Sequence, residues 1–421
     1  MNNGFITKIH INQVRNIKDT DIELSSDEAK NLILTGPNGS GKTSLLAALR
    51  LYLTYVMERD TKLLELGSDP IKNQFDSAYF DNEATNTDVN DMFEPPTNEE
   101  IQNRAANASG VRVELSNMDA CFDKYQKGQF IVAYYQAERE YAVQNKDEAK
   151  KMALQDTYSV RESPGQDFVE YLKNLILQEN MYRFNPSKKN TEQADGLQQR
   201  ITLITQALRN IYANESLELD FDVAGMSLRI KEPDKAAYAF NELASGYAAV
   251  LYIVLDLMMR MEKKITNAYD LPGIVMIDEV DAHLHLSMQR NVLKNLTDLF
   301  PNIQFIVTTH SPFVLNSVDD AVIYDLGNKL RLDGKDGIAN LPYSGIVEGY
   351  FGADELSAQL KDKFERYKIL AQKEDLTDDD YVELGDLETT LDSIPDFLAT
   401  GIMANYRQIK LELWAREEGK A

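Results

Sequence analysis

The segment that most constrains the fold is GPNGSGKT, residues 36–43, because it stands between an apolar strand pattern and a helical pattern. Leu32 to Leu34 precede the segment, and the helical pattern covers Ser44 to Tyr55. Its three glycines let the backbone turn so that successive N–H groups point at phosphate oxygens, and the helix N-terminus adds positive potential. A glycine-rich turn of this composition can arise by chance. A strand before the segment and a helix after it, however, are the context that a phosphate-binding loop requires.

Two side chains of this loop predict nucleotide and metal chemistry. Lys42 would reach the β- and γ-phosphates, and Thr43 would ligate Mg²⁺. The predicted phosphate-binding residues are Gly36, Pro37, Asn38, Gly39, Ser40, Gly41, Lys42, Thr43 and Ser44.

A second constraint is GIVMIDEVDAHLH, residues 273–285. Ile274 to Ile277 form an apolar run without alternation, which indicates a parallel strand covered on both faces. The run ends in Asp278 and Glu279, and the carboxyl ends of strands in α/β sheets open into the crevice that binds ligands. Alone, the two acids could simply begin a loop. The phosphate loop upstream favours a nucleotide site.

Other strand patterns alternate with helical ones, as a parallel α/β sheet requires. The predicted strands lie within Phe5–Leu24 (two, with Asn16–Asp21 at or near the turn) and at Val111–Leu115, Phe130–Tyr134, Leu217–Val223, Met226–Ile230 and Ile303–Val307. The predicted helices are Asp167–Tyr182, Glu192–Tyr212, a helix opened by Asn241–Tyr247 and running to Met261, and Ser287–Leu299.

Gln136 follows the strand pattern that covers Phe130 to Tyr134. A glutamine at a strand exit could contact Mg²⁺ or position the attacking water. A glutamine in a surface loop is also commonplace, so both interpretations stay open.

The expected fold class is α/β, with a mixed sheet, a helical insertion lobe and a C-terminal helical module. Residues 1–330 form the head, with a polar, mobile surface insertion at about 64–110 and the helical lobe at about 141–215. Residues 331–421 form three amphipathic helices that serve assembly or partner docking, or that pack on one another and on the head.

These three helices are predicted from shared faces and from a capping box made by Thr377 and Asp380. The faces consist of Leu356, Leu360, Phe364 and Tyr367, then Tyr381, Leu384, Leu387 and Leu391, then Leu398, Ile402, Tyr406, Ile409 and Leu413.

Charge and cysteine content narrow the class of protein. The 44 basic and 68 acidic residues give a formal charge of −24, which opposes non-specific association with nucleic acid or anionic membrane. A single cysteine, Cys121, excludes an internal disulfide and fits a reducing compartment. No segment has the ~20 apolar residues that span a bilayer, and the first residues lack an apolar signal-peptide core. A cytoplasmic protein is expected.

Four motifs stand in one order: GPNGSGKT, LASGY, IVMIDEVDAHLH and TTHSP. This set resembles the head of ABC-type ATPases over roughly residues 5–330. The resemblance is to the branch that includes SMC-like repair ATPases and the ATPases of bacterial anti-phage systems, such as AriA of PARIS or PtuA of Septu. It implies ATP and Mg²⁺ as ligands.

The resemblance assigns roles by position. Asp278 acts on Mg²⁺, Glu279 is the general base or water-orienting acid, and Asp281 takes the place of the D-loop aspartate. His310 is the switch histidine at the γ-phosphate. Gln136 is a candidate catalytic and metal-binding residue from its place at the strand exit, and not from the resemblance.

LASGY corresponds to the signature loop, which contacts ATP held by a second subunit in a head-to-tail dimer. Ala244 stands where the family usually has serine, so Ser245, Gly246 and backbone N–H groups would bind the phosphate. Slow turnover is therefore possible.

His283, His285 and His310 could suggest zinc, but the only cysteine is remote in sequence. His283 and His285 are better explained as shaping the loop after Asp281.

The resemblance leads to an ATP-hydrolysing subunit of an anti-phage complex. It would form a homo-oligomeric scaffold that holds and releases a separate Toprim-like or HNH nuclease, and a phage-encoded protein could be the trigger. GIVEGYFGADE, residues 345–355, is similar to the opening of a Toprim domain, but its surroundings are helical and no nuclease is expected in this chain. A DNA-repair ATPase acting directly on DNA and a non-hydrolysing interaction module are the alternatives.

Overall fold

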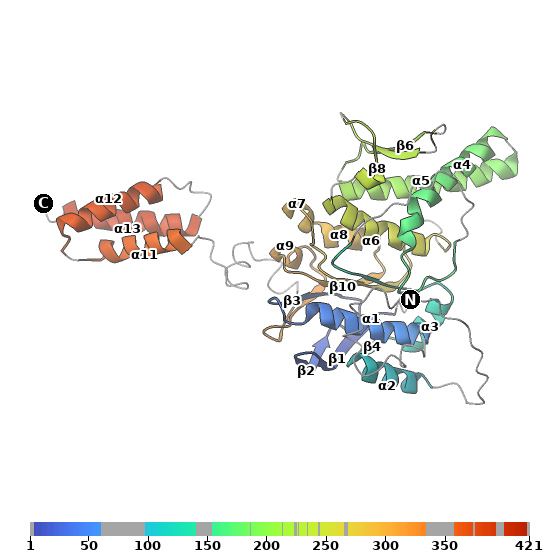
Figure 1. The fold of residues 1–421 in the computed structure, drawn as a ribbon, viewed down its shortest axis with the longest axis horizontal. Helices are drawn as coiled ribbons and strands as arrows, with labels where there is room; N and C mark the ends of the chain where they lie inside the picture. The colour runs from blue at the N-terminus through green and yellow to red at the C-terminus, as the bar shows by residue number, and fades with distance from the viewer. Residues whose placement is uncertain are drawn as a thin grey trace. The chain divides into compact units, whose positions relative to one another are not determined.

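The computed structural model divides the chain into two units, Met1–Asn340 and Leu341–Ala421 (Figure 1). The structure describes residues 4–59, 97–139, 154–333, 358–392 and 400–418, apart from positions 186, 213, 223–224, 226, 234, 243–244, 265–267 and 374. The centre of the predicted polar insertion, the Toprim-like segment and Ala244 lie outside the described residues.

The first unit is organised around a six-stranded sheet with the order β12-β11-β3-β10-β9-β5. Its strands are β3 (Asn31–Thr35), β5 (Ile131–Tyr135), β9 (Gly273–Ile277), β10 (Ile303–Thr308), β11 (Ala321–Asp325) and β12 (Leu330–Asp333). All neighbours are parallel except β12, which pairs antiparallel with β11. The predicted α/β class with a mixed sheet is therefore confirmed.

Helix α1 (Lys42–Glu58) lies against one side of this sheet and buries twelve of its 17 residues. It contacts strands β5, β9 and β10 of the main sheet and strands β1 and β4 of a smaller sheet. The two sheets and α1 share one hydrophobic core, in which Leu45, Leu49 and Leu53 are fully buried. The start of α1 is therefore fixed against the strands that precede the predicted site.

The smaller sheet has the order β2-β1-β4, with β1 at Ile6–Val14, β2 at Ile17–Glu23 and β4 at Val111–Leu115. Its turn is shorter than predicted. Val14 pairs directly with Ile17, so Asn16 belongs to the turn and residues 17–21 already lie in β2. The positive φ of Arg15, 51°, allows this tight reversal.

The described end of the predicted polar insertion corrects the expectation of a mobile surface segment. Residues Asn98–Ser109 form helix α2, which begins with a capping box between Thr97 and Glu100. Ile101, Ala105 and Ala106 are buried in the core that α2 shares with α1. The composition of this segment is mostly polar, but its few apolar residues form one stripe along the helix, which composition alone does not reveal. Helix α3 (Met118–Gln126) also contacts α1.

In Figure 1, helices α4, α5 and α6 lie on the other side of the main sheet from α1. Helices α4 (Phe168–Phe184) and α5 (Lys188–Tyr212) pack on each other and on α6 (Ser245–Met261), as the predicted helical lobe requires. A short 3₁₀ helix (Pro164–Asp167) precedes α4, and another (Phe240–Glu242) precedes α6. The third sheet contains β6 (Glu218–Asp222), β7 (Ser227–Lys231) and β8 (Tyr238–Ala239).

The single helix predicted over residues 287–299 is wrong, because two helices occupy this range. Helix α7 (Leu286–Gln289) is capped by the side chain of His285, and α8 (Val292–Leu299) follows. The side-chain amide of Asn291 donates to the carbonyl of Ser287, which competes with the helical pattern at the break. Helix α9 (Pro312–Leu315) follows β10.

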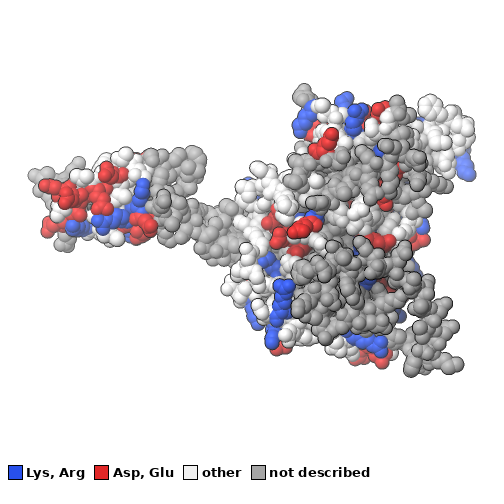
Figure 2. All heavy atoms as spheres, in the orientation of Figure 1, with Lys and Arg blue, Asp and Glu red and all other residues white. Residues whose placement is uncertain are grey.

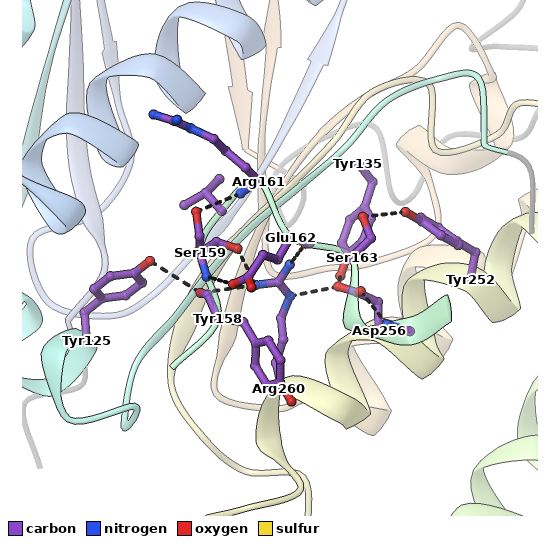
Figure 3. A network of polar contacts seen from close by, with 12 residues as sticks. Tyr125, Tyr135, Tyr158, Ser159, Arg161, Glu162, Ser163, Tyr252, Asp256 and Arg260 are labelled. Carbon is purple, nitrogen blue, oxygen red and sulfur yellow. Dashed lines mark hydrogen bonds and ion pairs between the residues drawn. The ribbon is translucent and has the colours of Figure 1, made fainter. Parts of the chain in front are cut away.

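A buried polar network ties α6 to strand β5 (Figure 3). Asp256 has no exposed surface, and its carboxylate accepts from Tyr135 Oη at 2.7 Å, Arg260 Nε at 2.8 Å and Gly165 N at 2.9 Å. A Cβ at Gly165 would lie 2.7 Å from the Asp256 backbone, so the close approach requires glycine. Arg260 also donates to the carbonyl of Ser159 at 3.0 Å. Buried charges are tolerated when they are paired in this way.

The second unit has a core of its own formed by α11 (Ala358–Ala371), α12 (Asp378–Asp392) and α13 (Thr400–Glu418). The predicted faces are confirmed for Phe364, Tyr367, Leu384, Leu387, Leu391, Tyr406 and Leu413. Tyr381 is 47% exposed, so it does not join the other residues of its predicted face in the core. Leu356 and Leu398 lie outside the described residues. The capping box is confirmed: Thr377 N donates to Asp380 Oδ2 at 2.8 Å, and Asp380 N to Thr377 Oγ1 at 3.3 Å.

Two further observations concern the described residues. None of their helices combines the length and the apolar character that crossing a membrane requires. Cys121 is buried beside Gly4, and burial raises the pKa of its thiol to about 11.

The Asp256 network predicts a large stability loss for Tyr135→Phe. The substitution removes a hydrogen bond to a buried carboxylate and keeps the ring, so we expect the free energy of unfolding to fall by about 1.5–3 kcal/mol. Urea unfolding of the whole chain, followed by circular dichroism, measures this fall. Trp414, the only tryptophan, reports separately on the C-terminal unit.

Tyr252→Phe is the matched control, because Tyr252 Oη donates to a neutral hydroxyl, Ser163 Oγ, at 3.0 Å. Its expected cost is about 0.5–1.5 kcal/mol. Equal costs for the two substitutions would contradict the importance of the buried carboxylate.

Candidate functional site

The predicted site residues meet at one edge of the main sheet because four parallel strands end there together. Register pairs Ile277 with Tyr135 on one side and with Val307 on the other, and Thr308 with Leu34. The next residues along each strand exit are therefore neighbours. Gln136, Asp278, His310 and the phosphate loop all follow these strand ends. The structure thus brings together segments that are far apart in sequence.

The phosphate loop has the backbone that its glycines predict. Gly36, Gly39 and Gly41 have φ angles of 133°, 82° and 100°, which L side chains rarely adopt. A Cβ at Gly41 would also lie 2.9 Å from Ile17 Cδ1. These positive φ angles let the loop turn its backbone N–H groups toward a common point, which suits an anion. Behind the loop, Gly327 in the β11–β12 turn contacts Pro37.

Lys42 lies across this loop and is only 6% exposed. Its Nζ donates to the carbonyls of Gly36 at 2.9 Å and Pro37 at 3.1 Å. Burial lowers the pKa of the Lys42 ammonium, and the carboxylates of Glu279 and Asp278 oppose that shift. The lysine therefore connects the loop to the acid pair electrostatically.

The acid pair Asp278 and Glu279 is held by one hydroxyl that the sequence reasoning missed. Thr308 Oγ1 donates to Asp278 Oδ1 at 2.6 Å and accepts from Glu279 N at 2.7 Å. Thr43 Oγ1 donates to the same Asp278 oxygen at 3.3 Å. Asp278 is 3% exposed, so its carboxylate has little freedom to move. The position of Thr308 at the end of the strand beside β9 was the available signal.

Arg139 also lies against this pair and was not predicted. Its two terminal nitrogens donate to the carbonyls of Asp278 and Glu279, each at 2.9 Å. Glu279 has a φ of 45°, a left-handed conformation that costs a non-glycine residue about 1–2 kcal/mol. Strain of this kind persists where surrounding contacts hold it, often at functional sites. A lone arginine in a loop gives no sequence signal for such a role.

His310 and Asp281 lie on the loops next to the acid pair. The Thr309 hydroxyl donates to Asp281, and Ser311 caps α9 by accepting from Phe313 N at 3.2 Å. Burial, followed by the charge of Lys42, lowers the pKa of His310. The imidazole is therefore neutral near pH 7 and has one ring nitrogen available to accept and one to donate.

Gln136 is exposed at the exit of β5, next to Asp278 in the sheet. It lines a cavity of about 210 Å³ together with Tyr134, Arg139, Arg161 and Tyr252. The predicted location at a strand exit is confirmed, whereas its contact with metal or water stays a prediction.

The signature segment begins helix α6. A Cβ at Gly246 would lie 2.9 Å from the carbonyl of His283, whose own φ is 64°. Within one chain, this glycine therefore packs on the loop that follows Asp281. Ser245 is the first residue of α6. The phosphate contacts of Ser245 and Gly246 stay a prediction.

The strand order, the phosphate loop and the acid pair define a P-loop nucleotide-binding protein. Residues 32–316 match the model of the family described as "AAA domain, putative AbiEii toxin, Type IV TA system". This range is more than half of the 421 residues and contains the whole site. The chain belongs to this family, and membership implies that it binds ATP.

Two retron proteins and one Septu protein are among its relatives. The chain is 32% identical to the Retron Ec83 probable ATPase of Escherichia coli over 163 residues, 37% of this chain and 30% of that protein. It is 24% identical to the Septu protein PtuA of Bacillus mycoides (strain KBAB4) over 385 residues, 87% of this chain and 47% of that protein. It is 25% identical to the Retron Vc95 probable ATPase of Vibrio cholerae serotype O1 biovar El Tor over 403 residues, 79% of this chain and 76% of that protein.

The predicted resemblance to PtuA is thus confirmed, whereas the resemblance to AriA stays a prediction. The chain spans less than half the length of the Ec83 and PtuA relatives. A solved Smc head bound to the C-winged helix domain of ScpA covers 78% of the chain at 12% identity, with a TM-score of 0.38. The fold assignment rests on the strand order and strand directions of the main sheet, and not on this comparison.

The lowered pKa of His310 predicts a pH dependence of stability. Its pKa in the folded protein is below the unfolded value of about 6.5, so the unfolded chain binds more protons as the pH falls below that value. The contribution of His310 to the free energy of unfolding is therefore fully present above about pH 6.5 and decreases as the pH falls below that value. We expect His310→Asn to reduce the fall in Tm between about pH 7.5 and 5.5, measured by thermal unfolding without nucleotide.

His283→Asn is the control, because His283 is exposed on a nearby loop and asparagine tolerates its positive φ. An unchanged pH dependence in His310→Asn would contradict the assignment to His310.

Proposed function

We propose that the chain is the ATP-hydrolysing subunit of an anti-phage defence complex. The hydrolytic part rests on one observation: Thr43 and Thr308 both donate to Asp278 Oδ1. The same Thr308 hydroxyl accepts from Glu279 N, and the carboxylates of Glu279 and Asp278 act on the charge of Lys42. Phosphoryl transfer needs metal, charge neutralisation and a positioned water more than covalent catalysis. These residues supply the groups for all three.

The residues fit Mg²⁺ and a triphosphate. Thr43 Oγ1 and Asp278 Oδ1 are 3.3 Å apart, and hydroxyl and carboxylate oxygens are ligands that Mg²⁺ prefers. Asp278 would act through water, and Gln136 would join from the neighbouring strand exit. When bound, Mg²⁺ neutralises charge on the β- and γ-phosphates. Lys42, now on two backbone carbonyls, would exchange them for phosphate oxygens.

The other proposed roles concern the γ-phosphate end of the nucleotide. Glu279 orients or deprotonates the attacking water, and the neutral His310 donates to the phosphate. Asp281, which accepts from the Thr309 hydroxyl, would lie near this end. Ser245 and Gly246 of a second copy would complete the site in a head-to-tail dimer. Because Ala244 replaces the usual serine of that loop, we propose that turnover is slow.

The defence assignment is supported by the names of the relatives, Septu PtuA and two retron ATPases. This chain would act in the cytoplasm inside a homo-oligomeric complex. It would hold a separate nuclease, HNH-like or Toprim-like, until an infection signal such as a phage protein arrives. PARIS remains the alternative system to Septu.

The C-terminal unit supports the docking part of this proposal. Helix α12 carries seven acidic and no basic residues, and acidic side chains gather on the face of this unit shown in Figure 2. Tyr381, Val382 and Trp414 are exposed by 47%, 67% and 55%. Large apolar side chains among charges are typical of surfaces that bind partners.

Two substitutions test ATP hydrolysis. Lys42→Ala removes charge-assisted contacts and is expected to weaken ATP binding by about 10–100-fold. Glu279→Gln is expected to retain binding and lower kcat by about 10²–10⁴-fold. Phosphate release and binding of a fluorescent ATP analogue measure the two effects. Lys30→Ala is the matched lysine control, because Lys30 precedes the N-terminal end of strand β3 and the phosphate loop follows its C-terminal end.

Wild-type turnover in Glu279→Gln would refute the role of Glu279. An absence of turnover in the wild type, with ATP bound, would favour a non-hydrolysing interaction module. Strong stimulation by duplex DNA would instead favour an ATPase that acts directly on DNA, against the −24 charge.

A further inference from the structure

Arg139 is a buried cation that none of the roles above uses. It is 8% exposed and lies three residues after Gln136, on the same strand exit. Its Nε is buried without a partner among the described residues. A buried donor without a partner is costly and requires an explanation.

The two terminal nitrogens of Arg139 bind consecutive carbonyls, those of Asp278 and Glu279, each at 2.9 Å. Consecutive carbonyls of an extended strand point in opposite directions. They reach one guanidinium here because Glu279 has a φ of 45°. The planar fork of arginine suits two acceptors side by side, whereas a lysine ammonium is a single point charge.

Glu279 is consequently fixed on both sides of its backbone. Its N–H donates to Thr308 Oγ1 at 2.7 Å, and its carbonyl accepts from Arg139 at 2.9 Å. These two contacts set the direction in which the Glu279 side chain leaves the backbone. Within the described part of the chain, no hydrogen bond or ion pair engages the Glu279 carboxylate, so it can accept from water.

We propose that Arg139 is a positioning residue for Glu279: it holds the left-handed turn that aims this carboxylate at the attacking water. The inference rests on the proposed hydrolysis of ATP and deepens it. Arg139 and Gln136 both follow strand β5. The arginine therefore also holds the segment that carries Gln136 in a fixed position relative to Asp278 and Glu279. Displacement of a reacting group by about 1 Å can cost about 100-fold in rate.

Arg139→Ala is expected to lower kcat by about 10–100-fold and to change the Kd for ATP by less than about threefold. Arg139→Lys should recover only part of the rate, because it cannot bridge both carbonyls. Millimolar guanidinium should partly restore Arg139→Ala, whereas urea should not. Arg161→Ala is the matched control, since Arg161 lines the same cavity and is exposed.

A double-mutant cycle with Glu279→Gln separates positioning from a general effect on folding. If Arg139 acts through Glu279, Arg139→Ala should change the residual single-turnover rate of Glu279→Gln by less than about threefold. Additive losses in the cycle would overturn the inference. So would parallel losses of kcat, ATP affinity and Tm in both Arg139→Ala and Arg139→Lys.

These outcomes are distinguishable from a failure of the proposed function. A wild-type chain that binds ATP without turnover refutes hydrolysis, and with it this inference. A wild-type chain that turns over, with Arg139→Ala equally active, refutes only the role of Arg139. If Arg139→Ala does not fold, Arg139→Lys and Arg139→Gln provide the same comparison.

Discussion

The Thr308 hydroxyl is the contact on which the geometry of the site depends. It donates to the Asp278 carboxylate and accepts from the Glu279 N–H, so one atom orients both acids. Thr308 ends β10, the strand between β3, which leads into the phosphate loop, and β9, which carries the acids. The parallel sheet therefore places phosphate binding and water activation side by side without long connections.

Much of this arrangement could be predicted because its signals are local. The glycines at 36, 39 and 41 predict the positive φ angles of the phosphate loop, and the apolar run before Asp278 predicts a buried strand. Tertiary contacts give no such signal. The bond from Tyr135 to Asp256 and the Arg139 fork join residues more than 100 positions apart, and no spacing rule connects them.

The wrong predictions have physical causes of the same kind. Helix α2 was hidden because its polar face dominates the composition, while only Ile101, Ala105, Ala106 and Ser109 are buried. The break between α7 and α8 depends on a side-chain contact of Asn291 that periodicity ignores. Tyr381 had the spacing of a core residue, but the three-helix core is complete without it.

The buried thiol of Cys121 has a practical consequence. With a pKa of about 11, only about one thiol in ten thousand is ionised at neutral pH, and the side chain is 1% exposed. Maleimide reagents, which react with thiolates, should therefore leave the native chain largely untouched. A single cysteine introduced on an exposed loop would carry a fluorophore selectively. The proposed association of two copies could then be tested by energy transfer without first removing the native residue.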